Sequence, residues 1–393
     1  MFKKKGEKKE YKGFFGKHKL AIASTTLVGT VVGAGILGIP YIVAKTGIIY
    51  GAILMIVLGL GYMLINLFVG EIVLRTKKQH QLPGYVGKYL GRWGKRAMTF
   101  SVLVGAYGAL TAYLIGEGAT LHSIFKFGTP LLYSLIFFLI TFYIIYKGVK
   151  ATGKAELVLI SLLFLVILLI GIFSFHKIEL QHLAYMNLGK IFVPYGVILF
   201  AFLGLSSIPE MQEELGKDKK LLKKAIIIGS VIPIVLYIIF SVVIVGIVGL
   251  NNFEALGPNE RIATIALGVY SHPIMNVFAN LLAILAMFTS FLTIGIALVE
   301  VYHYDYGLSR KLSLFLAFSL PLLVVVFKLS SFIVVLGITG AVAGGLDGIL
   351  IILAYWKSKI LGDRKPEYSL GKHYILGSLL ILMFILGIVY LFF

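Results

Sequence analysis

The sequence contains no cysteine, which excludes disulfide bonds, thiolate chemistry and metal sites with cysteine ligands. Charged residues are also scarce: they make up 13% of the 393 residues, against 59% for hydrophobic residues. The chain has no GxxxxGK[ST] loop, so it carries no P-loop for the direct use of ATP. It shows no paired acid and base, nucleophile triad or metal cluster that would suggest catalysis. We therefore expect a protein that is not an enzyme and has no catalytic residues.

Long apolar runs fill the chain. Its mean hydropathy is +0.97, and runs of ~20 residues, long enough to cross a bilayer as helices, recur along its whole length. The first run is about 25 residues long, which exceeds the core of a secretory signal peptide, so we expect it to be a retained span. The sequence therefore predicts an all-α polytopic membrane protein. We expect eleven spans, at residues 20–45, 48–73, 97–121, 129–146, 156–175, 191–209, 225–249, 272–301, 312–327, 330–356 and 373–392.

The net charge of +19 follows from where the basic residues lie. If the chain starts inside, 30 of its 36 lysines and arginines fall in cytoplasmic segments. The positive-inside rule then places the N-terminus in the cytoplasm and the C-terminal Phe393 outside. The charge is thus explained by topology, and we expect no nucleic acid partner. Residues 75–96 combine basic residues with apolar ones at helical spacing, among them Trp93, which predicts an amphipathic helix on the inner membrane surface.

Two of the expected spans are interrupted by glycine and proline. The first contains Gly-Ala-Gly-Ile-Leu-Gly-Ile-Pro at residues 33–40, and the sixth contains Gly-Leu-Ser-Ser-Ile-Pro at residues 204–209. A break inside a bilayer frees backbone groups that only protein or a polar cavity can satisfy, so it indicates a ligand site. The alternative is close packing of helices at small residues, which does not require Pro40. The two breaks lie five spans apart and run in opposite directions, and such inverted pairs are typical of secondary transporters.

At these residues the chain resembles the amino acid/polyamine/organocation (APC) transporter superfamily. Residues 200–207 are similar to the sixth-helix segment of the superfamily, and residues 105–121 and 337–353 are similar to the third and tenth helices of its amino acid/auxin permease branch. The resemblance implies a five-plus-five inverted-repeat, LeuT-like fold with broken helices 1 and 6 and an eleventh helix. The implied parts are a basic cytoplasmic tail at 1–19, repeats at 20–175 and 191–356, and the additional helix at 373–392.

The first break offers groups that bind an amino acid without a charged side chain. The half-helix that begins near Gly35 directs free N–H groups and a positive dipole end at an anion, so we assign the N–H groups of Ala34 and Gly35 to a carboxylate. The resemblance implies that the carbonyl of Val31 and carbonyls around Phe200 and Leu203 hold the ammonium. The expected substrate-binding residues are Val31, Gly33, Ala34, Gly35, Ile36, Tyr107, Phe200, Leu203, Gly204 and Ser206.

Three aromatic residues are candidates for the walls of this site. We expect Phe200 to cover the substrate and either Tyr107 or Tyr113 of the third span to face it. The alternative for each ring is packing or contact with lipid. Ser206 stands where many members of the superfamily carry a glutamate, and this departure argues against a simple proton-linked mechanism.

The eighth span carries two adjacent hydroxyls that suggest an ion site. Hard oxygen ligands suit a small cation, and in sodium-coupled relatives this helix and the first one hold the ion. Serine and threonine in spans more often bond to their own helix. Some proton-coupled relatives place a lysine in the fifth helix, whereas residues 157–175 contain no charge, so sodium is favoured over a proton. The resemblance implies sodium ligands at Gly29, Val32, Ala286, Thr289 and Ser290.

Together these features predict a secondary active transporter that imports neutral amino acids across the cytoplasmic membrane by alternating access, coupled to sodium. The alternatives are a proton-coupled symporter or exchanger and, in another class, a membrane sensor that binds an amino acid without appreciable transport. The expected partners are an amino acid, sodium or a proton, and the lipid bilayer, with no other cofactor. The choice of amino acid, the oligomeric state and the roles of the intramembrane carboxylates Glu117 and Asp347 stay open.

Overall fold

The computed structural model describes residues 19–148, 177–271 and 273–392, together with residues 161, 162, 165, 166, 168, 169 and 172. Throughout this part of the chain every regular element is a helix. Seven of the described helices are long and apolar enough to cross a membrane, and the bent pair α2 (Lys19–Val31) and α3 (Gly35–Thr46) forms an eighth candidate. The predicted all-α membrane architecture is therefore confirmed. The tail expected at 1–19 and the fifth span expected at 156–175 lie almost wholly outside the described residues.

Three long helices follow the bent pair: α4 (Ile48–Arg75), α5 (Leu82–Phe125) and α6 (Pro130–Lys147). Their ends coincide with residues that favour turns. Gly47, with a φ of 102°, separates α3 from α4, and Gly148, with a φ of 76°, follows α6. Glycine adopts these positive φ angles without the strain that a side chain causes.

The second half opens with another interrupted span, formed by α9 (Tyr195–Ala201) and α10 (Ser207–Leu215). The predicted breaks in helices 1 and 6 are both present. The first pair of half-helices is bent by 58°, and five residues separate the second pair. The remaining helices are α11 (Leu222–Ala255), α13 (Pro273–Glu300), α14 (Arg310–Val326), α15 (Phe332–Thr339), the π-helical turn η5 (Gly340–Gly344), α16 (Gly345–Leu361) and α17 (Tyr374–Val389), with short α8 (Leu180–Ala184) and α12 (Ala263–Tyr270) in connections.

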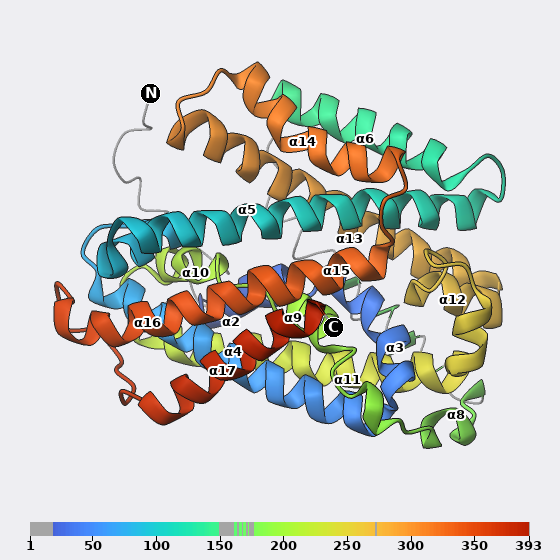
Figure 1. The fold of residues 1–393 in the computed structure, drawn as a ribbon, viewed down its shortest axis with the longest axis horizontal. Helices are drawn as coiled ribbons and strands as arrows, with labels where there is room; N and C mark the ends of the chain where they lie inside the picture. The colour runs from blue at the N-terminus through green and yellow to red at the C-terminus, as the bar shows by residue number, and fades with distance from the viewer. Residues whose placement is uncertain are drawn as a thin grey trace.

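The two halves are interleaved rather than laid end to end. Helix α5 runs along much of the bundle and packs against α6, α13, α14, α15 and α16, as Figure 1 shows. Helix α11 packs against α2, α3 and α4. Each interrupted span also contacts the other, through α3 with α9 and α2 with α10. The two breaks therefore lie in the centre of the molecule.

The amphipathic segment at 75–96 is only partly as predicted. Leu82, Tyr85 and Tyr89 at the start of α5 are buried on one face. Gly91 then interrupts the helix with φ 75° and ψ −163°, and this kink reorients the residues that follow. Trp93 is 78% exposed, so its expected place on the same apolar face is wrong.

One fully buried carboxylate holds the C-terminal end of α4 to the loop between α16 and α17. Glu71 accepts hydrogen bonds from Arg75 at 2.8 Å and from the N–H of Leu370 at 2.8 Å, and it pairs with Lys359 of α16. A buried carboxylate is tolerated only when cations and donors surround it in this way. The loop and α17 are therefore fixed to α4 and α16.

The absence of cysteine allows a direct test of the predicted topology. Lys328 between α14 and α15 and Lys365 between α16 and α17 are both exposed, and one span separates them. The variant Lys328→Cys should react with a membrane-impermeant maleimide in intact cells, whereas Lys365→Cys should react only after permeabilisation. The cysteine-free parent measures the background. The reverse labelling pattern would overturn the orientation derived from the basic residues.

Candidate functional site

The two breaks pack against each other in a reciprocal way. A Cβ atom on Gly35, where α3 begins, would lie 2.6 Å from the Cα of Ala201, where α9 ends. A Cβ atom on Gly204, in the second break, would lie 2.5 Å from a methyl carbon of Val31, where α2 ends. Each glycine thus makes room for the end of the other span's first half-helix. This pairing is what the inverted arrangement of the spans predicts.

A tyrosine of α11 connects the same two half-helix ends. The hydroxyl of Tyr237 lies 2.8 Å from the carbonyl oxygen of Val31 and 2.8 Å from that of Ala201. The residue is fully buried. Carbonyls at a helix end lack partners within the helix, and this one hydroxyl is shared between a carbonyl of each break. Tyr237 was not predicted as a site residue, although the hydroxyl of a tyrosine in an apolar span needs a buried hydrogen-bond partner.

The carbonyl of Val31 has two potential hydrogen-bond donors, contrary to the expectation that the break leaves it free. It accepts the Tyr237 hydroxyl and also the N–H of Gly33 at 2.9 Å. The premise that the break leaves this oxygen unpaired is wrong, because the chain turns back on itself at Gly33 and α11 supplies a second donor. Its role in binding an ammonium stays a prediction.

The N–H groups assigned to a carboxylate lie at the start of α3, and their role stays a prediction. Helix α3 begins at Gly35, so the N–H groups of Gly35 and Ile36 have no acceptor within it. Among the hydrogen bonds of the described residues, none is donated by the N–H of Ala34. All three residues are buried. This cluster of N–H groups at the positive end of α3 suits an anion.

In the second break, some backbone carbonyls accept local hydrogen bonds and others have no observed donor among the described residues. The carbonyl of Phe200 accepts the N–H of Leu203 at 3.1 Å, and the carbonyl of Gly204 accepts the hydroxyl of Ser207 at 2.8 Å. The carbonyl of Leu203 accepts no bond from the described part of the chain. Ser206 is exposed and caps nothing. The carbonyl of Leu203 is therefore available as an acceptor for an ammonium.

Of the two tyrosines considered for the facing wall, the structure brings only Tyr113 to the break. A Cβ on Gly33 would lie 3.7 Å from the Tyr113 hydroxyl and 3.9 Å from the hydroxyl oxygen of Ser290. The hydroxyl of Tyr107 instead contacts that of Tyr302 at 2.6 Å and donates to the carbonyl of Leu316 at 2.9 Å. The placement of Tyr107 in the substrate site is thus contradicted, because this side chain faces α14.

The expected sodium ligands are only partly assembled. Ser290 would lie 3.9 Å from a Cβ on Gly33, so α13 does face the first break. The carbonyl of Gly29 has lost its usual helical donor, because the N–H of Gly33 bonds to Val31. Thr289, however, donates to the carbonyls of Leu285 at 3.2 Å and Ala286 at 3.1 Å within its own helix. Val32 is buried beside the break.

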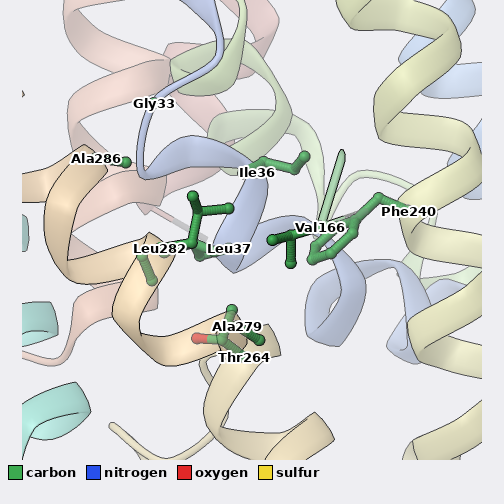
Figure 2. A pocket seen from close by; sticks show the side chains of 10 residues that line it. Gly33, Ile36, Leu37, Val166, Phe240, Thr264, Ala279, Leu282 and Ala286 are labelled. Carbon is green, nitrogen blue, oxygen red and sulfur yellow. The ribbon is translucent and has the colours of Figure 1, made fainter. Parts of the chain in front are cut away.

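An apolar cavity borders both sets of predicted residues. Gly33 and Leu37 line it on the side of the first break, and Ala283 and Ala286 line it on α13 (Figure 2). Gly33, a predicted substrate-binding residue, and Ala286, a predicted sodium ligand, therefore line the same cavity. The buried hydroxyl of Thr264 also lines it and has no hydrogen-bond partner in the described part of the chain.

Besides Glu71, the described membrane spans contain two buried carboxyl groups, Glu117 and Asp347. Both oxygens of Glu117 and one oxygen of Asp347 lack a partner among the described residues. Glu117 lies one helical turn from Tyr113 on the same face of α5. Asp347 of α16 interacts with Ser101, which also donates to the carbonyl of Ala343 at 3.0 Å in the π-helical turn η5. Glu117 is thus the carboxyl group nearer in sequence to the wall of the site.

Comparison with known proteins identifies the relatives of the chain. The tryptophan/tyrosine permease family matches residues 17–392. The chain is 26% identical to tyrosine-specific transport system 1 of Haemophilus influenzae, covering 93% of this chain and 94% of that protein. It is 23% identical to glutamine transporter 2 of Aliivibrio fischeri, and the match covers 82% of this chain and 85% of that protein. The structure of MhsT in complex with L-phenylalanine is similar, with a TM-score of 0.66 and 17% identity over 94% of this chain and 97% of that chain.

These findings confirm the predicted fold, since MhsT has the LeuT fold. They agree with a broad resemblance to amino acid transporters of the APC superfamily. They do not support the narrower resemblance to the amino acid/auxin permease branch, because the family that matches is the tryptophan/tyrosine permeases.

Substitutions at two nearby glycines should separate ligand binding from packing. A Cβ on Gly33 meets only ordinary contacts at 3.7 and 3.9 Å, whereas one on Gly35 collides with the backbone of Ala201. Gly33→Ala should fold normally and weaken amino acid binding, because its methyl group enters the space beside Tyr113. Gly35→Ala should lower the free energy of unfolding by about 1–3 kcal/mol. Thermal unfolding and ligand binding of the purified variants would measure both effects.

Gly105→Ala is the matched control, because its Cβ would lie 3.6 Å from Ala343 and away from the breaks. It should change neither property. Normal stability of Gly35→Ala would contradict the close packing of the two breaks.

Proposed function

The chain belongs to the tryptophan/tyrosine permease family, and we propose that it imports neutral amino acids across the cytoplasmic membrane by secondary active transport. Its relatives are amino acid transporters, so the chain is a transporter and not an enzyme. Transport would proceed by alternating access around a site at the two breaks. The alternative of a sensor without transport has no support from these relatives.

The observation that carries the proposal is the pair of breaks in contact. The first has buried N–H groups at Ala34, Gly35 and Ile36 that would bind a carboxylate, and the second has the carbonyl of Leu203, which would accept from an ammonium. An amino acid zwitterion carries both groups at the same carbon. The described residues that line the cavity beside the first break are all uncharged, which favours a neutral side chain.

The relatives favour an aromatic substrate. Two tyrosine-specific transport systems of Haemophilus influenzae match this chain over more than nine-tenths of its length. Because glutamine transporter 2 of Aliivibrio fischeri is also a relative, an amino acid with a polar neutral side chain is the next candidate substrate. We therefore propose tyrosine, phenylalanine and tryptophan as the first substrates to test, followed by glutamine.

Contacts between the inner half-helices support their movement as one unit. The hydroxyl of Thr26 on α2 donates to the carboxylate of Glu214 on α10 at 2.9 Å. Lys19 pairs with Asp218 beyond the end of α10 at 2.6 Å. Because these bonds join the inner ends of both interrupted spans, rocking of one against the rest of the bundle would carry the other with it.

For the coupling ion, we propose sodium at the junction of α2 and α13. The freed carbonyl of Gly29 and the hydroxyl of Ser290 support this choice, and Val32, Ala286 and Thr289 would complete the site. Ala286 and Thr289 would first have to exchange their mutual bond for the ion.

Proton coupling is the second candidate because of Glu117. Its carboxyl group is fully buried in the third span without a partner among the described residues. Such a group carries a charge only at high cost and is stable as the neutral acid. It could therefore take up and release a proton during transport.

Uptake into proteoliposomes with separate sodium and proton gradients tests the function and the ion. An inward sodium gradient should drive accumulation of an aromatic amino acid. Replacing Thr289 and Ser290 with alanine should raise the sodium concentration for half-maximal uptake about tenfold, because two oxygen ligands are lost.

The variant Glu117→Gln distinguishes the two ions. Under sodium coupling it should leave the sodium dependence in place. Uptake that follows the proton gradient, ignores sodium and is lost in Glu117→Gln would replace sodium with a proton. Binding of amino acids without uptake under any gradient would support the sensor instead.

A further inference from the structure

Tyr237 holds an unusual position because one hydroxyl faces two acceptors. The carbonyl oxygens of Val31 and Ala201 each lie 2.8 Å from its oxygen, so they are within twice that distance of each other. A phenol has a single proton to donate. Only one of the two carbonyls can receive a strong hydrogen bond from Tyr237 at a time.

The surroundings keep these three groups together. Gly35 brings the start of α3 against Ala201, and Gly204 brings the second break against Val31. The ring of Tyr237 also packs on Phe202, with 5.3 Å between the ring centroids. The phenol, the two carbonyls and both breaks thus form a single buried unit.

The carbonyl of Ala201 has fewer donors than that of Val31. Val31 also accepts the N–H of Gly33, whereas Tyr237 is the donor observed for Ala201 within the described residues. Each carbonyl oxygen has two lone pairs, so with the Gly33 N–H and the Tyr237 hydroxyl as the donors observed among the described residues, the two oxygens can accept further hydrogen bonds. An ammonium group has three N–H donors and can supply one.

We propose that Tyr237 is a positioning residue for the ammonium of the transported amino acid. It gathers the carbonyls of both breaks, and the ammonium of a bound amino acid donates to one of them while the Tyr237 hydroxyl donates to the other. This inference rests on the proposed function and adds a residue to it. Preorganised acceptors avoid the free-energy cost of collecting them on binding.

The test compares two tyrosines that donate to carbonyls. Tyr62 of α4 is buried and donates to the carbonyl of Gly344 at 2.6 Å, away from both breaks. Tyr237→Phe and Tyr62→Phe each remove one buried hydroxyl, so they should have comparable effects on thermal stability. Tyr237→Phe alone should raise the KM for the amino acid about tenfold, with a smaller change in the maximal rate.

A second measurement separates positioning from general damage. Competition by L-phenylalanine and by its 2-hydroxy acid analogue, which lacks the ammonium, gives the preference for the ammonium. In Tyr237→Phe this preference should fall about tenfold, and in Tyr62→Phe it should equal that of the wild type.

The outcomes distinguish this inference from the proposed function. A preference that is unchanged or increased in Tyr237→Phe would overturn the positioning role while transport itself stands. Equal effects of both variants on KM would do the same. If the wild-type protein neither binds nor transports any amino acid, the proposed function fails and the role of Tyr237 fails with it.

Discussion

The structure depends on the requirement that backbone groups freed inside a membrane find partners. Two spans of this chain are interrupted near their middle, and each break would be costly on its own. The fold meets that cost by bringing the breaks together. Gly35 and Gly204 allow the contact, and the Tyr237 hydroxyl lies within hydrogen-bond distance of a carbonyl of each break. The groups that stay free, such as the N–H of Ala34, are the ones that a ligand can use.

The fold could largely be predicted from the sequence because its signals are local. Apolar runs give the spans, and glycine with proline gives the breaks at residues 33–40 and 204–209. The contact between the breaks followed from topology. The kink at Gly91 was missed, since the helical spacing of residues 82–93 continues through it and only a φ of 75° reveals it.

The site was harder to predict because its hydrogen bonds join residues far apart in the chain. Tyr237 and Val31 are 206 positions apart, and no local pattern indicates where a tyrosine hydroxyl will point. The same limit explains Tyr107 and Tyr113, which lie on one helix but face different neighbours. Residues that act through the backbone, such as Ala34 and Gly35, were easier to identify because the break itself locates them.

The bond between Tyr237 and Val31 also has a consequence for the order in which the protein is made. The first break is synthesised long before its partners, since Ala201 and Tyr237 belong to the sixth and seventh spans. A nascent chain that has inserted only five spans lacks both the packing surface for Gly35 and the donor for Val31. After Val31 is made, synthesis continues for 206 residues before Tyr237, a donor to the Val31 carbonyl, is made. Until then the N-terminal half lacks contacts that complete its structure.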